Sequence, residues 1–563
     1  MGKEPPPPIP GPAPSARLSW SLIAVAGSAA IGLALMVDQA TRSSATYDEV
    51  TYLRVAAHWW RTGDQELISR MGSPVTFWKI QQAPTLWALD RSGRGDWIDR
   101  PIENQAKLLP AVRIGGLWIW LVALGVAANW ARILYGPRAM AMASALFALG
   151  PNLLAHGALA TMEMPLVACT SAIFYGFWRF LRDGSRRHFW MAAAVGGLAM
   201  SCKFTTVLVP PILAMAWAVD LRRSSRPAGR IARAVVPGMI GFVAAMVAAN
   251  LVVTGCATIP LSAREGDHPI LSGRLSPGVA RWASRLFEAS YPQDWVGFAT
   301  QVIHQRNGGP SYLMGERSLT GWAHYYPVTL AVKVPLAFLL LFAARAGLGR
   351  RRGDRDWLLP FVVGTFLLAA IVGSKRNYGV RYLLPIAIPA IVWTSAMAEG
   401  RRWSRIVAGL GVAGMAASIG SIHPHELTYF NAIAGGPIGG RRILSDSNLD
   451  WGQGARSLAR LQRGRPEFRD LTLFYFGDTD PAYYGVEGRR YVCDANRTPD
   501  DLPPVLAAGT KYLAVSASLQ WGPWGPAGYF RRLDAVRPVC FTDDSTIAVY
   551  DAACLADPGG GRP

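Results

Sequence analysis

"HFWMAAAVGGLAMSCKFTTVLVPPILAMAWAVD", residues 188–220, is the stretch that decides how the rest of the chain is arranged. Its 33 residues exceed the roughly 20 that cross a bilayer once. Lys203 lies in the middle of the stretch, and Pro210 and Pro211 follow it. Two short helices that meet at residues 201–203 fit this pattern best. A single kinked helix is the alternative, and it would reverse the side on which every later segment ends.

Apolar runs of this kind recur along the chain and account for its composition. Hydrophobic residues make up 51% of the sequence and charged residues only 17%, against about 25% charged residues in a typical soluble protein. The first run, Leu18–Val37, is too long for a signal-peptide core and lacks a cleavage pattern. The other runs are centred on residues 113–131, 139–154, 164–181, 188–202, 205–220, 234–255, 325–345, 357–374, 380–398 and 404–421. The sequence therefore predicts a polytopic α-helical membrane protein with about eleven transmembrane helices.

The arginines between these runs choose between the two interpretations of residues 188–220. With eleven spans and the N-terminus inside, every short arginine-rich connection lies on the inner side, as the positive-inside rule requires. These connections carry Arg132 and Arg138, then Arg182, Arg186 and Arg187, then Arg222, Arg223, Arg226, Arg230 and Arg233, then Arg350, Arg351, Arg352 and Arg355, and finally Arg401, Arg402 and Arg405. With one span fewer, the last two clusters would lie outside. The same clustering argues against nucleic-acid binding as the reason for the net charge of +20.

This topology divides the chain into parts. Residues 1–17 are proline-rich and are predicted to form a disordered cytoplasmic tail. Residues 18–421 form the transmembrane module, and we expect its loops 38–112 and 256–324 outside. Residues 422–551 combine the strand-like runs "DLTLFYFG", "KYLAVSA" and "TIAVYD" with the helical pattern "ARSLARLQR", which predicts an extracytoplasmic α/β domain before a disordered tail, 552–563. No pattern in this domain looks catalytic, and we interpret it as a domain that gathers an acceptor or a partner.

The six cysteines show no metal-binding spacing. Three of them, Cys493, Cys540 and Cys554, lie in the part expected outside, where one pair would have an oxidising environment for a disulfide. The sequence does not indicate which pair.

Acids and bases from separate turns are predicted to converge on the outer face of the bundle. An ionisable side chain at membrane depth costs about 2.5–3.5 kcal/mol on insertion scales, so it usually faces a cavity or a partner. Simpler interpretations exist: a lysine that reaches the headgroups, arginines that bind lipid phosphate, an acid favoured at a helix N-terminus, and an N-cap. The converging residues are Asp48, Glu49, His156, Glu163, Lys203, Lys375, Arg376, Tyr378 and Arg381.

Two carboxylates and several cations around one cavity suit group transfer from a phosphate. A carboxylate can take the proton from an attacking hydroxyl. Cations can hold an anionic leaving group and stabilise its charge as the bond to it breaks. A site beside the membrane also suits a phosphate carried on a lipid.

Several blocks of the chain, in order, resemble the protein O-mannosyltransferase/aminoarabinose transferase superfamily. The first is "YDE" at residues 47–49, which resembles the acidic motif of the first outer loop. The others are "PNLLAHGALATMEMP", "GLAMSCKFTTVLVPP", "GERSLTGWAHYYPVTLAVKVPLAFLL", "GVRYLLPIAIP" and "YFNAIAGGPIGGRRILSDSNLDWGQG". The resemblance extends from about residue 18 to residue 551. It implies the GT-C fold of bacterial family 39-like glycosyltransferases, in an inner membrane with the active site and C-terminus extracytoplasmic.

The resemblance also implies roles. Such enzymes move a sugar, with inversion, from a polyprenyl-phosphate or pyrophosphate carrier to a hydroxyl of a protein, lipid or glycan. Asp48 would be the catalytic base, and Glu49 would support it or orient the acceptor. Glu163 stands where the family often has Asp, as an acceptor or metal contact. Lys203 and Arg381 would face the lipid phosphate, and His156, Arg376 and Tyr378 would complete the substrate site.

Two departures from the family pattern bear on the substrate. The nearest match to a His-Pro-Pro-Leu-like motif is "QQAPTL", with Gln82, Pro84 and Thr85, which leaves the acceptor open. No clustered histidines or DxD motif indicates a metal, so no metal site is assigned and a divalent cation stays an open question.

Two other functions compete with this interpretation. A lipid or glycan transporter or flippase would use the same arginines for an anionic headgroup, but it predicts two related halves, which the sequence does not display. A non-catalytic relative would bind a partner through the C-terminal domain. The sequence indicates neither the sugar nor the oligomeric state.

Overall fold

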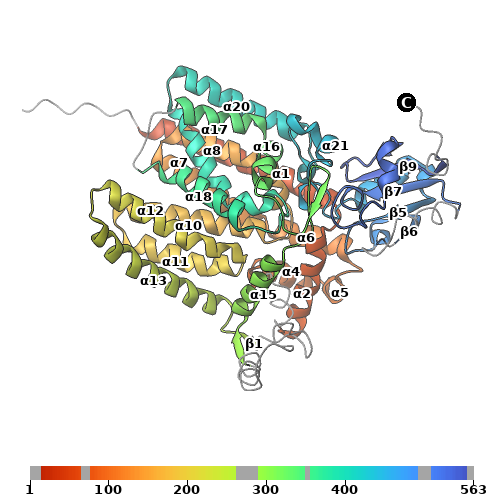
Figure 1. The fold of residues 1–563 in the computed structure, drawn as a ribbon, viewed down its shortest axis with the longest axis horizontal. Helices are drawn as coiled ribbons and strands as arrows, with labels where there is room; N and C mark the ends of the chain where they lie inside the picture. Colours follow the sequence, from red (N-terminus) through yellow and green to blue (C-terminus); the bar gives the residue numbers. More distant parts are fainter. Residues whose placement is uncertain are drawn as a thin grey trace, which may run out of the picture.

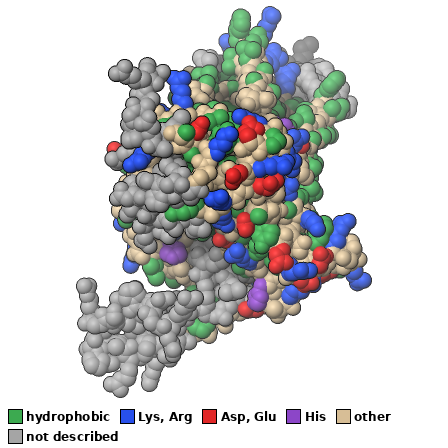
Figure 2. Space-filling model, turned by 90° about the vertical axis from the view of Figure 1, so that its right-hand side faces the viewer, with side chains coloured by type: hydrophobic (Ala, Val, Ile, Leu, Met, Phe, Trp, Pro, Cys, Tyr) green, Lys and Arg blue, Asp and Glu red, His purple; other side chains and the backbone are tan. Residues whose placement is uncertain are grey.

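The computed structural model describes residues 14–64, 76–260, 289–348, 355–491, 493 and 509–553. Long helices run side by side and form most of the molecule, and the C-terminal sheet lies at one end of them (Figure 1). The expected polytopic helical architecture with a C-terminal α/β part is confirmed. Figure 2 shows the end that carries the sheet, where acidic and basic side chains are interspersed over the surface.

All of the apolar runs predicted as spans are helical. They form α1 (Pro14–Arg42), α6 (Gln105–Gly115) with α7 (Leu117–Leu134), α8 (Pro137–Ala148) with α9 (Pro151–Gly157), α10 (Glu163–Asp183), α11 (Arg186–Met200), α12 (Val209–Arg223), α13 (Ala228–Val253), α16 (Tyr325–Lys333) with α17 (Leu336–Leu348), α18 (Leu358–Gly373), α19 (Ala387–Ser395) and α20 (Arg402–Gly420). Within the described residues, 7 segments are long and apolar enough to span a membrane, or up to 9 if each of two bent pairs is one span. The bent pairs are α8 with α9 and α16 with α17. The remaining two runs, α11 and α18, are only 15 and 16 residues long, shorter than the roughly 20 residues that cross a bilayer once. Of the eleven expected spans, the described residues therefore support seven to nine.

The first helix is longer than the sequence predicts. It begins at Pro14, inside the segment expected to be a disordered tail, and ends at Arg42 rather than Val37. A proline is tolerated in the first turn of a helix because the N–H groups there have no intrahelical acceptor. Residues 1–13 of the expected tail lie outside the described residues.

The decisive stretch 188–220 is broken where the sequence predicts. Helix α11 ends at Met200, the 3-10 helix η1 covers Phe204–Leu208, and α12 starts at Val209. Pro210 and Pro211 occupy the first turn of α12, where their missing N–H groups cost no hydrogen bond. The break is held by a buried network in which Asn250 and Ser201 both donate to a carboxylate oxygen of Asp294, over 2.8 and 3.0 Å. The stretch therefore forms two separate helices, as expected, and not the single kinked helix that was the alternative.

The connections between helices gather at the two ends of the bundle. At one end the backbone N–H of Arg138 donates to Glu399 over 2.7 Å, and Arg355 pairs with Asp220 over 2.7 Å. These contacts join connections that carry the arginine clusters. The sheet and the outer helices α2 (Tyr47–Thr62), α4 (Thr76–Arg91), α5 (Gly95–Asp99) and α15 (Gln293–Asn307) lie toward the other end (Figure 1). Which end faces the cytoplasm stays a prediction.

Two small two-stranded sheets lie in the segment between α13 and α16. Strands β1 (Thr258–Pro260) and β2 (Ser290–Pro292) pair antiparallel, as do β3 (Ser311–Leu313) and β4 (Glu316–Ser318). Most of the expected outer loop between β1 and β2 lies outside the described residues.

The C-terminal part is a mixed five-stranded sheet in the order β6-β5-β7-β9-β8. The three strand-like runs of the sequence contain β5 (Leu471–Phe474), β7 (Tyr512–Ser516) and β9 (Ile547–Asp551), and the helical pattern is α22 (Ala455–Gly464). Leu458 of α22 packs in one cluster with Leu473 and Val549 of the sheet. The edge strands are β6 (Arg489–Arg490) and β8 (Cys540–Phe541). Two short helices are α21 (Gly436–Gly440), which precedes the sheet in the sequence, and α24 (Ala517–Gln520), which directly follows β7. The disulfide expected among Cys493, Cys540 and Cys554 stays a prediction, because Cys554 lies outside the described residues.

Candidate functional site

Four charged side chains from four separate segments meet at the end of the bundle that faces the sheet. Arg381 Nη1 lies 2.8 Å from Asp48 Oδ2 and 3.6 Å from Glu163 Oε1. Lys203 Nζ lies 3.0 Å from the same Glu163 oxygen. Asp48 belongs to α2, Glu163 to α10, and Lys203 precedes η1, while Arg381 lies in the 3-10 helix η2 (Val380–Ile386). The two acids and two bases form one connected ion network.

Local sequence explains where the two acids stand. Asp48 lies in the first turn of α2, which Thr46 caps, and Glu163 is the first residue of α10. The N-terminus of a helix carries a partial positive charge, which favours acids in the first turn. The two helices therefore present Asp48 and Glu163 at the ends that meet Arg381.

These charges border a cavity of about 650 Å³ between the bundle and the C-terminal part. Six of the eight site residues predicted from the sequence line it: Asp48, Glu163, Lys203, Arg376, Tyr378 and Arg381. Arg376 donates to the hydroxyl of Tyr378 over 3.0 Å, and Lys203 lies 4.2 Å from the centre of the Tyr382 ring. The other two predicted residues, Glu49 and His156, do not line this cavity.

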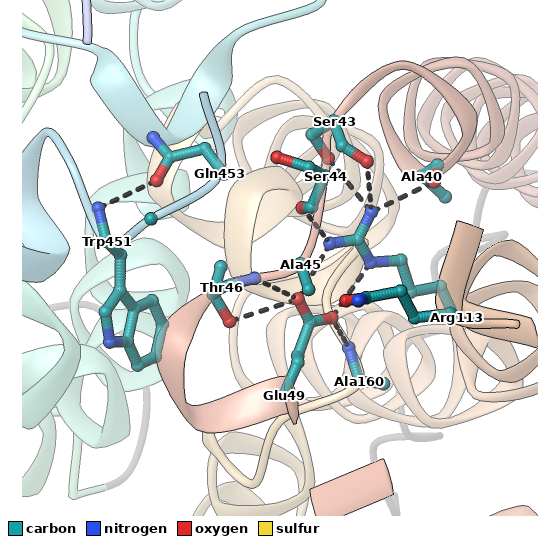
Figure 3. Close-up of polar contacts among 12 residues, drawn as sticks. Ala40, Ser43, Ser44, Ala45, Thr46, Glu49, Arg113, Ala160, Trp451 and Gln453 are labelled. Carbon is teal, nitrogen blue, oxygen red and sulfur yellow. Dashed lines mark hydrogen bonds and ion pairs between the residues drawn. The ribbon is translucent and has the colours of Figure 1, made fainter. Parts of the chain in front are cut away.

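Glu49 is buried behind the cavity in an ion pair with Arg113 (Figure 3). Both side chains are 0% exposed, and Arg113 Nη2 lies 2.7 Å from Glu49 Oε2. The backbone N–H groups of Thr46 and Ala160 donate to the same carboxylate over 2.9 and 2.8 Å. Burial alone would raise the pKa of Glu49, but Arg113 and these hydrogen bonds hold it below its usual range. Glu49 thus ties α2 to α6 and to the segment before α10.

Arg113 extends this tie to the end of α1. Its guanidinium donates to the carbonyl groups of Ala40, Ser43 and Ser44 over 3.0, 3.1 and 2.9 Å (Figure 3). Both terminal nitrogens of this buried cation therefore donate to carbonyl oxygens. A charge held away from water needs such hydrogen-bond partners.

His156 lies under the wall of the cavity rather than in it. It is 1% exposed, and its ring stands edge-on to Trp451, with ring centres 6.1 Å apart. Neither ring nitrogen has a hydrogen-bond partner among the described residues. Trp451 in turn lines the cavity, and the Arg381 guanidinium lies 4.3 Å from its ring centre.

The C-terminal part supplies cavity residues that the sequence did not single out. We expected no catalytic pattern there, yet Asp446, Trp451, Tyr475 and Phe476 line the cavity. Burial raises the pKa of Asp446 to about 6, with Arg381 opposing the shift and Asp48 adding to it. Asp446 and Trp451 belong to "SDSNLDWGQG", residues 445–454. The many polar residues and glycines of this segment are the sequence signal that could have indicated a functional loop.

Residues 445–454 reach the cavity because they are anchored on both sides. The N–H of Tyr47 donates to the carbonyl of Trp451 over 2.8 Å, and the N–H of Val380 donates to the Asn448 side chain over 3.0 Å. Asp450 accepts hydrogen bonds from the backbone of Gly452 and Ser518, and burial raises its pKa to about 7. The segment therefore joins α2 and η2 to the sheet.

The residues at the place of the expected acceptor motif lie in α4 and do not line the cavity. Gln82 is 0% exposed and donates to the carbonyl of Val112 over 2.9 Å, whereas Pro84 is exposed. Among the described residues, no group of three or more His, Cys, Asp or Glu is placed to hold a metal ion.

Comparison with known families supports this resemblance over part of the chain. Residues 107–253 match the sequence model of a family described as dolichyl-phosphate-mannose-protein mannosyltransferase. This stretch is about a quarter of the chain and includes Glu163 and Lys203. Over it, the resemblance that the sequence indicates is confirmed, and glycosyltransferase chemistry is supported. No curated protein matches the chain.

Two solved structures are similar at low identity. ArnT from Cupriavidus metallidurans bound to undecaprenyl phosphate is 13% identical, with a TM-score of 0.47, over 96% of this chain and 100% of its own. The oligosaccharyltransferase AglB from Archaeoglobus fulgidus, in complex with an inhibitory peptide and a dolichol-phosphate, is 12% identical, with a TM-score of 0.39, over 94% of this chain and 74% of its own. TM-scores this low do not establish a common fold.

Proposed function

We propose that this chain is an inverting glycosyltransferase of the GT-C type, which moves a sugar from a polyprenyl-phosphate donor to a hydroxyl acceptor on the extracytoplasmic face. The observation that carries the proposal is the ion network of Asp48, Glu163, Lys203 and Arg381 at one cavity. The family match over residues 107–253 adds support, because it names lipid-phosphate sugar chemistry.

The cations would hold the donor phosphate. Arg381 and Lys203 lie side by side on Glu163, and Arg376 lines the same cavity. An arginine can bind phosphate with two parallel hydrogen bonds, and such charge-assisted bonds are about twice as strong as neutral ones. The same groups would stabilise the negative charge that the phosphate gains as it leaves.

Asp48 would serve as the base once the donor phosphate has bound to Arg381. In this cavity Asp48 shares Arg381 with Glu163, and its side chain is 29% exposed. The acceptor oxygen forms a bond to the anomeric carbon while the bond from that carbon to the phosphate oxygen breaks. The electron pair leaves with the polyprenyl phosphate, and the acceptor proton passes to Asp48. Attack opposite the leaving phosphate inverts the anomeric carbon.

Transfer from radiolabelled donors tests this function directly. Purified full-length protein in nanodiscs is given polyprenyl-phosphate sugars with serine- and threonine-containing peptides, oligosaccharides and hydroxyl-bearing lipids. We expect the wild type to release polyprenyl phosphate and label one acceptor class, and D48N to lose most of this activity. The control D96N removes an exposed carboxylate of α5 outside the cavity and should behave as wild type. Equal transfer by D48N would remove Asp48 from its role.

The same purified protein, reconstituted in closed vesicles, separates the two competing functions. In proteoliposomes, donor that changes leaflet without losing its sugar would indicate a flippase. Failure of the wild type to cleave any donor while the C-terminal part still captures a partner would indicate a non-catalytic relative.

A further inference from the structure

Four aromatic rings form a continuous row along the C-terminal side of the cavity. We call Tyr47, Phe476, Trp524 and Tyr378 the aromatic wall; all four line the cavity. Successive ring centres are 5.9, 6.0 and 6.0 Å apart, and the planes of the first three rings are inclined by only 13° and 19°. Tyr47 and Tyr378 come from the helical module, whereas Phe476 and Trp524 come from the C-terminal part.

The rings of this row are offset rather than stacked face to face. Carbon atoms in contact lie about 3.5–4.0 Å apart, so near-parallel rings with centres 5.9 Å apart must be displaced sideways. If the two rings were stacked directly face to face at this distance, the space between them would be too narrow to hold an atom. Protein interiors are close-packed, so such an empty gap is disfavoured. Tyr47 is 44% exposed, and Phe476 and Trp524 are half-buried, so these three rings present an apolar surface to the cavity. Tyr378 is 7% exposed and lies at the buried end of the row.

Charged groups stand beside this apolar surface. Asp478 and Arg490 line the cavity, and Asp478 pairs with Arg54 over 3.4 Å. The side chains of this pair are 31% and 50% exposed, so solvent or a ligand reaches them. A flat apolar surface beside a few polar side chains suits a ligand that is apolar on one face and carries hydroxyl groups at its edge. A sugar ring has this character.

A second part of the cavity lining comes from other elements. Phe204 and Thr205 of η1 and Gln301 and His304 of α15 form this side. Helix η1 leads directly into the apolar helix α12, so this side adjoins the spans from which a lipid-linked donor must arrive.

A peptide would need other features. An extended peptide is usually bound by main-chain hydrogen bonds along a free sheet edge. The edge strand beside the cavity, β6, has only two residues in the described part of the chain.

We propose that the aromatic wall is the acceptor subsite and that the acceptor is a carbohydrate, a sugar ring of a glycan or glycolipid. This assignment rests on the proposed glycosyltransferase function, with Asp48 as the base for the hydroxyl of that sugar. The wall thereby gives the C-terminal part a role in choosing the acceptor.

Binding of oligosaccharides to the full-length protein tests the wall without requiring turnover. The probes are maltotriose, cellotriose and an α-linked mannotriose, compared with a serine- and threonine-rich peptide of similar mass. We expect at least one trisaccharide to bind, and F476A and W524A to weaken its binding about tenfold each. W524F keeps a ring and should stay close to wild type. The control Y483A removes an exposed aromatic ring of the C-terminal part away from the cavity and should change nothing.

A parallel titration with undecaprenyl phosphate keeps failure of the wall distinct from failure of the proposed function. If this lipid binds equally to wild type, F476A and W524A, and the trisaccharide KM rises in transfer with kcat little changed, the assignment holds. If the lipid binds and donors are cleaved but no trisaccharide binds, or the peptide alone is accepted, the assignment falls while the proposed function stands. If no donor is cleaved, the proposed function is wrong. If a trisaccharide binds F476A and W524A as tightly as it binds the wild type, the aromatic wall is not the acceptor subsite.

Discussion

Two neighbouring carboxylates, each paired with an arginine, have opposite surroundings in this molecule. Asp48 meets Arg381 at the cavity with 29% of its side chain exposed, whereas Glu49 meets Arg113 with both side chains 0% exposed. Consecutive residues of a helix point about 100° apart, because 3.6 residues make one turn. One turn of α2 therefore directs one acid into the cavity and the next into the packing between helices. An acid that faces the cavity can exchange its arginine for a substrate, whereas an acid buried with its arginine cannot.

The largest expected effect of breaking this contrast is on stability. Removing one partner of a buried ion pair costs about 3–5 kcal/mol, because the other charge is left unpaired away from water. We expect E49Q to lower the Tm of the detergent-solubilised protein strongly, since it leaves the Arg113 guanidinium without its anion. D48N is the matched control, and it should lower the Tm less, because Arg381 keeps a second anion, Glu163, 3.6 Å away. An E49Q protein as stable as D48N would contradict the contrast.

A third carboxylate adds a pH dependence on the cavity side. Burial raises the pKa of Asp446 to about 6, and Asp48 adds to the shift while Arg381 and Arg376 oppose it. A raised carboxyl pKa means that the folded state holds the proton more tightly than the unfolded state. The stability gained from this proton is complete below about pH 4, the usual aspartate pKa, and is lost as the pH rises through 6.

The D446N variant isolates this contribution. Its amide stays neutral like the protonated acid, so wild type should lose stability relative to D446N between about pH 4 and 7, by up to about 3 kcal/mol. Melting curves of both proteins across that range measure the difference. A difference that does not change with pH would place Asp446 outside the buried environment seen here.

A smaller effect concerns the cation that the exposed acid shares. Arg381 contacts both Asp48 and Glu163. A hydrogen bond to a charged group contributes about 1.5–3 kcal/mol, so R381Q should bind undecaprenyl phosphate roughly 10- to 100-fold more weakly. R94Q, which changes an exposed arginine before α5, is the control. Unchanged affinity in R381Q would assign the phosphate to other cations of the cavity.

The sequence predicts the meeting of Asp48, Glu163, Lys203 and Arg381 because each lies in a turn on the same side of the bundle. Counting spans and arginine clusters is sufficient for that, since the side follows from the number of crossings alone. The break at residues 201–203 was predictable for a similar reason: the run was too long, and its prolines suited the start of a helix.

Other features depended on contacts that no local pattern contains. Glu49 and His156 share turns with Asp48 and Glu163, but Arg113 and Trp451, far away in the sequence, decide what surrounds them. Asp446 enters the cavity only because the segment 445–454 is held against α2 and η2. The aromatic wall likewise combines residues from two parts of the chain whose docking the sequence does not specify.

The central claim is that Asp48, and not its neighbour, accepts the proton of the acceptor. Single-turnover transfer from prebound labelled donor measures this step apart from donor binding. We expect D48N to bind undecaprenyl phosphate at least as tightly as wild type, because Arg381 loses a competing anion, yet to transfer the sugar about 100-fold more slowly or worse. Single-turnover transfer by D48N at the wild-type rate would contradict the account.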